Sequence, residues 1–247
     1  MPRNRAFTLI EAGVTMAIIV TLTLVVTKVG HAVYVHSSLA TSAANIRNLA
    51  AGAAGYLADH NHRFWKFRDD SAEGTTWWWG FESNASKSRG EGNRTFDPSR
   101  GPLGDFVPAS FRPDPSFALS GSAFKPKFRN GYIGVGYNVL LGGGFFGTSK
   151  NPAIPVTYWS LSNPSRVVVF ATSAQVYPFS STPQIEEFYG LDHREKTVHF
   201  RHGGNAMVAF ANGSSGFLPL DKSTLDKRAP DAKIGRFAPV GSTQYLE

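Results

Sequence analysis

The sequence predicts an α+β protein in which one long N-terminal helix packs on a small head with an antiparallel β-sheet. Three observations lead to this fold class. An apolar run at residues 12–29 continues into apolar residues at helical spacing as far as about residue 61. No proline lies between Phe7 and Pro98 to interrupt this helix. The second half of the chain has short runs of β-branched and aromatic residues separated by glycine, asparagine and proline, as in strands.

The N-terminal stretch has the composition of a membrane segment. Arg3 and Arg5 lie in a basic start, and the apolar run after it is long enough, at about 1.5 Å per residue, to cross most of a bilayer core of about 30 Å. A secretory signal peptide has a small-residue cleavage site after its apolar run, but here the small residue Ala6 lies before it. We therefore expect residues 7–33 to form a transmembrane helix. The basic start predicts a cytoplasmic N-terminus and a head on the far side of the membrane.

The block that follows Ala6 consists of Phe7, Thr8, Leu9, Ile10 and Glu11. It resembles the N-terminal motif of the type IV pilin and type II secretion pseudopilin family. The resemblance implies that residues 1–6 are a leader, which a prepilin peptidase removes before it methylates the amino group of Phe7. It also implies a structural, non-enzymatic subunit without a cofactor, which assembles with other pilin or pseudopilin subunits from the inner membrane. The family usually has glycine where this chain has Ala6.

Glu11 has a physical role that follows from its position. A carboxylate in hydrocarbon costs several kcal/mol unless it is paired or lies at the interface. In a helical stack of subunits, the mature amino group of Phe7 on a neighbour is a suitable partner, so Glu11 is expected to set the axial register of assembly. The alternative is that Glu11 only sits among lipid headgroups near the cytoplasmic face.

Residues 34–61 are predicted to continue the helix as an amphipathic segment that faces the head. The apolar residues at three- and four-residue spacing are Val35, Leu39, Ala43, Ile46, Ala50, Ala53 and Leu57. A continuous helix from Phe7 to about Asn61 would be about 80 Å long. Such a length suits a filament subunit better than a free-standing domain.

Residues 62–220 are predicted to form one globular head. The chain has no cysteine, so packing of its many aromatic residues must stabilise that head. Trp77, Trp78 and Trp79 have two interpretations: a platform that stacks on sugars or bases, or at least one ring that covers the helix while the others are half-exposed. We favour the second. Residues 82–104 are polar and glycine-rich and are predicted to be a long surface loop.

Strands are predicted at residues 131–141 and 166–171, and the glycines at 142–144 are expected to form a loop. A three-stranded antiparallel meander is predicted from residues 197–201, 206–211 and 216–220, with turns at 202–205 and 212–213. The tail, residues 221–247, is charged and contains two prolines, which predicts a loosely packed extension.

A second resemblance lies in this meander. His202, followed after nine residues by Asn212 and Gly213, is similar to the His and Asp-Gly signature of a pseudopilin-like group in planctomycete- and verrucomicrobium-type bacteria. Asn212 stands where that group usually has aspartate. Some secretion pseudopilins hold calcium in a C-terminal loop, and replacement of an aspartate by Asn212 removes a charged ligand. We therefore expect no calcium there.

Other metal and catalytic sites receive little support from the sequence. His60, His62, His199 and His202 and the carboxylates near His193 are candidate transition-metal ligands, but they do not have a recognised ligand spacing. The sequence contains none of the common nucleophile, zinc-protease or phosphate-loop motifs. We expect neither a metal site nor an active site.

Two alternatives to a filament subunit remain open from the sequence. The formal charge of +7 permits weak attraction to nucleic acid. The first alternative is therefore a membrane-anchored module that binds DNA or polysaccharide through basic residues or Trp77–Trp79. The second is an anchored enzyme, which requires the histidines named above to come together.

Overall fold

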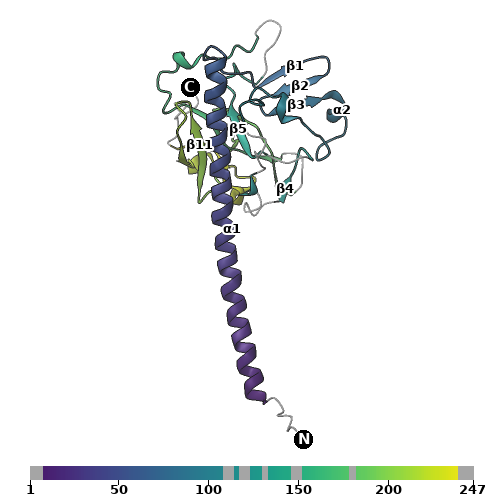
Figure 1. Cartoon of the computed structure of the whole chain (residues 1–247), viewed down its shortest axis with the longest axis vertical. Helices are drawn as coiled ribbons and strands as arrows, with labels where there is room; N and C mark the ends of the chain where they lie inside the picture. The colour runs from purple at the N-terminus through teal and green to yellow at the C-terminus, as the bar shows by residue number, and fades with distance from the viewer. Residues whose placement is uncertain are drawn as a thin grey trace.

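The structure, a computed structural model, describes residues 8–107, 114–116, 123–129, 133–145, 152–177 and 182–238. Its dominant element is α1 (Leu9–Asp59), a single helix of 51 residues and about 77 Å. The head packs against one side of only the C-terminal half of this helix, and the N-terminal half extends away from it (Figure 1). The continuous helix predicted from the sequence is confirmed over these residues.

Local interactions define both ends of α1. Thr8 caps its N-terminus in an extended conformation. At the other end His60 leaves the helical conformation, and Asn61 and His62 have φ angles of 52° and 56°. The His62 N–H turns back to the Leu57 carbonyl at 2.8 Å, which closes the last turn. The helix therefore stops two residues before its predicted end.

A mixed five-stranded sheet lies against the C-terminal half of α1. Its strand order is β12-β11-β6-β5-β9, all antiparallel except the pair β5–β9. The strands are β5 (Val135–Asn138), β6 (Val168–Thr172), β9 (Gly190–Leu191), β11 (Asn205–Phe210) and β12 (Ser215–Pro219). α1 packs on β11 and β6, and the core between them includes Ile46, Leu49, Tyr137 and Phe170. The α+β layout is confirmed, and the strands predicted at residues 131–141 and 166–171 are present as the shorter β5 and as β6.

The predicted three-stranded meander is wrong in one strand. The hairpin β11–β12 forms as expected, but the strand on the other side of β11 is β6 and not the segment at 197–201. That segment contributes β10 (Val198–His199), which pairs with β13 (Ile234–Gly235). The bridge between His202 and Asn205 closes the turn that leads from this segment into β11. Because both edges of β11 are taken by β6 and β12, the incoming strand has no free edge there.

Residues 68–104 form a small lobe, so the long loop predicted at residues 82–104 is wrong where β3, α2 and η1 lie and holds for the turns between and after them. The lobe contains the antiparallel sheet β1-β2-β3, a helical turn α2 and a 3₁₀ turn η1. These elements are β1 (Arg68–Asp70), β2 (Gly74–Trp77), β3 (Gly80–Ser83), α2 (Asn84–Lys87) and η1 (Pro98–Arg100). The strands have three or four residues and little apolar alternation, so no period can be detected in this part of the sequence.

The last described residues belong to the head. The predicted loose extension is wrong for residues 221–238, because β13 pairs with β10, and Ala232, Ile234 and Phe237 are buried. The 3₁₀ turns here are η4 (Lys222–Thr224) and η5 (Pro230–Ala232). A further sheet, β4-β8-β7, and the turn η3 complete the head. They are β4 (Ala123–Lys125), β7 (Gln175–Tyr177), β8 (Gln184–Glu186) and η3 (Tyr158–Ser160).

Candidate functional site

The candidate site has two parts, the N-terminal end of α1 and the junction where the helix enters the head. At the end, Thr8 and Glu11 form a capping box. The Thr8 hydroxyl accepts from the Glu11 N–H at 3.2 Å, while one Glu11 carboxylate oxygen accepts from both the N–H and the hydroxyl of Thr8 at 2.8 Å. The pair therefore satisfies N–H groups that a helix start leaves without partners.

The N-terminal half of α1 is an exposed apolar surface. Its large side chains range from 36% exposed at Val35 to 92% exposed at Leu9, and its most apolar stretch has no buried residue. The hydroxyls of Thr15, Thr21 and Thr23 donate to the carbonyls four residues before them, so these polar groups are satisfied within the helix. This half is long and apolar enough to cross a membrane.

Burial of α1 begins with Ser38 and continues with Ser42 and Asn45, polar residues on the face toward the head. Ser42 donates to an Asp114 oxygen at 2.6 Å, and the Ser116 N–H donates to the same oxygen at 2.9 Å. The other Asp114 oxygen accepts from Arg201, and both of these side chains are 1% exposed. Ser42 thus links the helix to a buried ion pair of the head. This link lies just after the exposed apolar half of α1 ends.

Arg201 organises the rest of this network. Its guanidinium donates to the Ser116 hydroxyl at 2.6 Å and to the Gly134 carbonyl at 2.7 Å. It also lies 3.1 Å from Nδ1 of the buried His199. Because arginine only donates, Nδ1 must accept, which requires the neutral imidazole with its proton on Nε2.

The charges of the network shift the pKa values of its members. Burial would raise the pKa of Asp114, but the Arg201 charge and the hydroxyls of Ser116 and Ser42 outweigh it and hold the pKa below its usual range. Burial and the Arg201 charge lower the pKa of His199 well below its usual value. The same two causes lower the pKa of His202 to about 4. Both imidazoles are therefore neutral at pH 7.

A cavity of about 310 Å³ opens beside this network, where α1 emerges from the head. Val35 and Leu39 line it from the helix, His202 lines it from the turn before β11, and Phe217 lines it from β12. Phe217 is 52% exposed. The exposed apolar surface of the helix thus continues onto the edge of the head.

The predicted motif residues His202, Asn212 and Gly213 form two turns. His202 begins a two-residue turn in which Gly203 and Gly204 have φ angles of 64° and 85°, as the tight hairpin turns require. Asn212 accepts from the Ser214 N–H at 3.0 Å and from its hydroxyl at 2.7 Å, and Gly213 has a φ of 85°. Both turns shape the chain around β11.

The candidate histidines lie in three different surroundings, and only His199 and His202 share one. His60 stacks on Tyr56, His62 meets Trp159 edge to face, and His199 and His202 belong to the Arg201 region. Within the described ranges, no group of three histidine, aspartate or glutamate residues could hold a metal ion. The histidine constellation that an anchored enzyme would need is not assembled by these residues.

Of the predicted site residues, Ala6 and Phe7 lie outside the described residues. Trp78 and Trp79 are buried at 1% and 7% exposure, and Trp77 is half-buried, so these rings belong mainly to the core. Sequence reasoning missed Asp114 and the role of Arg201. The signal for them was present in Ser38, Ser42 and Asn45, because polar residues on the buried face of a helix need polar partners.

Comparison with known proteins gives no further guidance. No family model, curated protein or solved structure matches the chain.

Proposed function

We propose that this protein is a membrane-anchored structural subunit of a type IV pilus-like or type II secretion pseudopilus filament. The observation that carries the proposal is α1, one unbroken helix with an exposed apolar half and a half fastened into the head. An apolar surface of this size needs either lipid or other apolar helices around it. A filament subunit has both environments in turn, first in the inner membrane and then in a bundle of neighbouring helices.

The N-terminal block supports the same proposal. Prepilin peptidase is expected to cut between Ala6 and Phe7, which leaves Glu11 as the fifth mature residue. The basic start keeps the N-terminus in the cytoplasm, and the head lies on the far side of the membrane. Within the bundle of helices, the mature amino group of Phe7 on one subunit pairs with Glu11 on another, and this pair sets the axial register.

The capping box gives Glu11 a second role that the experiment must separate from assembly. Glutamine in place of Glu11 still accepts from the Thr8 backbone, because a capping box works with either residue. It has no charge and therefore cannot form an ion pair with an amino group. Alanine removes both functions.

The first test is the mass and N-terminal chemistry of the protein recovered from its native membrane. The proposal expects a chain that starts at N-methylated Phe7. An intact Met1 contradicts it and indicates a plain signal anchor.

The second test measures incorporation of Glu11→Gln and Glu11→Ala into filaments, with comparable amounts of each variant in the membrane. We expect both variants to fail. Normal incorporation of Glu11→Gln would show that Glu11 only caps the helix, and the pairing with Phe7 would be wrong.

A further inference from the structure

A second cavity, of about 480 Å³, lies in the head away from the helix junction, and no residue of α1 lines it. It opens between the small lobe and the segments that carry Lys127 and Tyr189. Seven of its lining side chains are aromatic and four are polar. This volume lies in the range of about 300–1,000 Å³ that small-ligand sites occupy, and their walls have the same mostly apolar composition.

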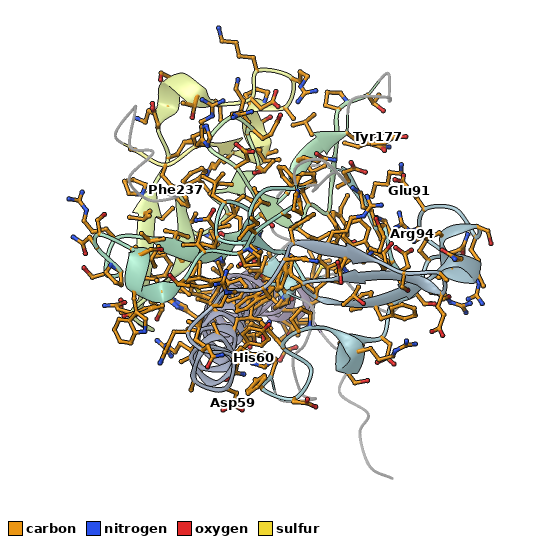
Figure 2. All side chains as sticks on the ribbon, turned by 90° about the horizontal axis from the view of Figure 1, so that it is seen from above. Asp59, His60, Glu91, Arg94, Tyr177 and Phe237 are labelled. Atoms are coloured by element: carbon orange, nitrogen blue, oxygen red, sulfur yellow. The ribbon has the colours of Figure 1, made fainter. Side chains whose placement is uncertain are left out.

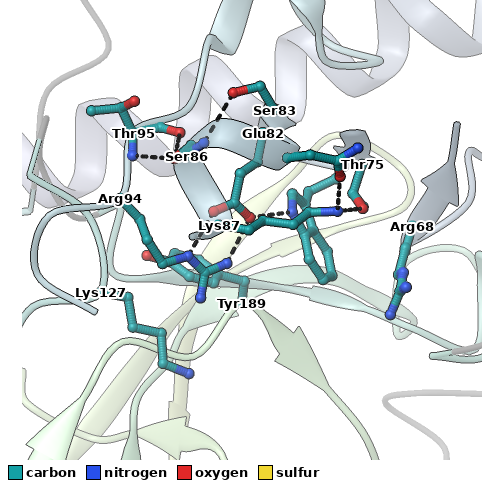
Figure 3. A network of polar contacts seen from close by, with 12 residues as sticks. Arg68, Thr75, Glu82, Ser83, Ser86, Lys87, Arg94, Thr95, Lys127 and Tyr189 are labelled. Atoms are coloured by element: carbon teal, nitrogen blue, oxygen red, sulfur yellow. Dashed lines mark hydrogen bonds and ion pairs between the residues drawn. The ribbon is translucent and has the colours of Figure 1, made fainter. Parts of the chain in front are cut away.

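The aromatic wall of this cleft is held rigidly. Trp79 stacks with Trp77 at 4.9 Å between ring centroids and with Tyr189 at 4.1 Å. Behind it lies Glu82, which is fully buried and accepts from the Trp77 indole N–H at 3.1 Å and from Arg94 in two bonds of 2.6 Å. Figure 3 shows Glu82, Arg94 and Tyr189 close together. A ligand would therefore meet a surface that is already ordered.

Two residues that line the cleft, Trp79 and Lys127, carry hydrogen-bond donors that the protein does not fully satisfy. The indole N–H of Trp79 is buried and has no acceptor among the residues that the structure describes. A buried donor without a partner costs free energy that a ligand acceptor would recover. The Lys127 amino group lies 3.4 Å from Glu186, longer than a charge-assisted hydrogen bond of about 2.7–2.9 Å, and extends away from Arg94 (Figure 3).

The charges of the cleft are balanced, which restricts the ligand. Arg94 is neutralised by Glu82 through two hydrogen bonds, and Lys127 faces Glu186. Glu195, which also lines the cleft, is exposed. A phosphate or a polyanion would gain little attraction here, because each cation already has an anionic neighbour and Glu195 would repel it.

We infer that this cleft binds a neutral oligosaccharide. The C–H faces of hexose rings pack on aromatic side chains, and hydroxyl groups both donate and accept. Sugar oxygens would accept from Trp79 and Lys127, and sugar hydroxyls would donate to Gln175 and Glu195. Single-stranded nucleic acid also stacks on aromatic rings, but it needs a positive groove for its backbone, which the balanced charges do not provide. The inference does not rest on filament assembly.

The experiment titrates the full-length chain with cellotetraose, maltotetraose and mannotetraose, followed by calorimetry and tryptophan fluorescence. The detergent must have a headgroup without sugar, since a maltoside would compete. We expect at least one tetrasaccharide to bind, with an affinity that is unchanged when the salt concentration is raised about tenfold, because a neutral ligand releases no counterions. No binding of any of the three at millimolar concentrations would overturn the inference.

Two matched pairs of variants locate the site. Trp79→Phe keeps an aromatic ring but removes the N–H, and we expect about a tenfold loss of affinity, as for one lost hydrogen bond. Its control is Trp65→Phe, because Trp65 also has a buried indole N–H without a described partner but does not line the cleft. Equal losses in the two variants would contradict the inference.

The second pair removes one positive charge at each of two lysines. Lys127→Met is expected to weaken binding several-fold, and it tests the site even if the tryptophan variants unfold. Lys125→Met is the control, since Lys125 pairs with Glu91 and lies over Tyr177, outside the cleft. Figure 2 shows Glu91 and Tyr177 on a side of the head away from the end of α1. A salt-sensitive affinity for oligo(dT) that falls equally in both variants, without tetrasaccharide binding, would overturn the inference in favour of nucleic acid.

Discussion

Asp114 and Arg201 form an ion pair in which each side chain is 1% exposed, and 87 positions of sequence separate them. Ser42 of α1 donates to the same carboxylate, so this hydrogen bond joins the helix to the head at the ion pair. A buried pair of this kind is a poor source of net stability, because removing both charges from water costs about as much as their attraction returns. We expect its contribution to be conformational specificity, because it fixes the position of the helix on the head.

Removal of one partner should be costly. In Asp114→Ala the Arg201 charge stays buried without compensation, and we expect a loss of about 3–5 kcal/mol in the free energy of unfolding. Urea unfolding of the full chain in micelles, followed by tryptophan fluorescence, measures it. The control is Asp69→Ala, which breaks the exposed pair with Lys66 and should cost less than about 1 kcal/mol. Similar losses in both would show that the network is solvated.

His202 should make the protein less stable in acid. Its pKa of about 4 in the folded state lies below its ordinary value of 6.5, so between these pH values the unfolded chain binds more protons than the folded one. Stability is fully present above pH 6.5 and falls by about 3 kcal/mol toward pH 4 from this group alone. In His202→Gln, unfolding measured near pH 7 and near pH 4.5 should show a smaller difference than in the parent chain. An unchanged difference would contradict the assignment.

Glu187 should have the opposite effect. It is fully buried, and burial raises its pKa to about 7, although the Tyr189 hydroxyl and the Lys127 N–H lower it in part. The folded state therefore holds a proton that the unfolded chain has lost above pH 4.5, and stability falls as the pH rises from 4.5 to 7. Glu187→Gln should stabilise the protein by up to about 3 kcal/mol near pH 8 and have little effect near pH 4.5. A gain of equal size at both values would refute a titration origin.

In the turn at Asn212 and Gly213, the first residue contributes side-chain hydrogen bonds and the second a backbone conformation with positive φ. An aspartate side chain would accept from Ser214 as Asn212 does, so Asn212→Asp should change the free energy of unfolding by less than about 0.5 kcal/mol. Gly213→Ala should cost about 1 kcal/mol, because its φ of 85° strains any residue with a Cβ although nothing lies within 4 Å. Gly216→Ala is the matched control, since Gly216 has no positive φ and its added Cβ would meet only Phe210, at an ordinary 3.7 Å. Equal costs in the two glycine variants would show that the backbone conformation is not the cause.

Elements with local periodicity could be predicted from the sequence. α1 follows from apolar spacing and the absence of proline, and the hairpin β11–β12 follows from alternation around an Asn-Gly turn. The partner of β11 could not be predicted in the same way. Which strand occupies an edge is decided by packing across the whole sheet, and β6 and the segment at 197–201 both contain buried apolar residues.

The polar centre of the junction also escaped prediction. Asp114 and Arg201 lie far apart in the sequence, and neither belongs to a recognised motif. The short strands of the lobe carry part of the cleft, but they have too few residues to show a period. The run Trp77–Trp79 did point to a possible binding site in this region of the sequence. The bond between Trp77 and Glu82 could not be predicted, because it joins two strands.

Because α1 is unbroken, the direction of the Glu11 side chain around the helix axis determines the direction in which the head lies. Glu11 and Ser42 are 31 residues apart on the same helix, and at about 3.6 residues per turn their side chains point about 220° apart around its axis. Any neighbour that fixes the azimuth of Glu11 therefore also fixes which side of the head faces outward. One alanine inserted near residue 33 would turn the head by about 100° while leaving both attachment points chemically intact.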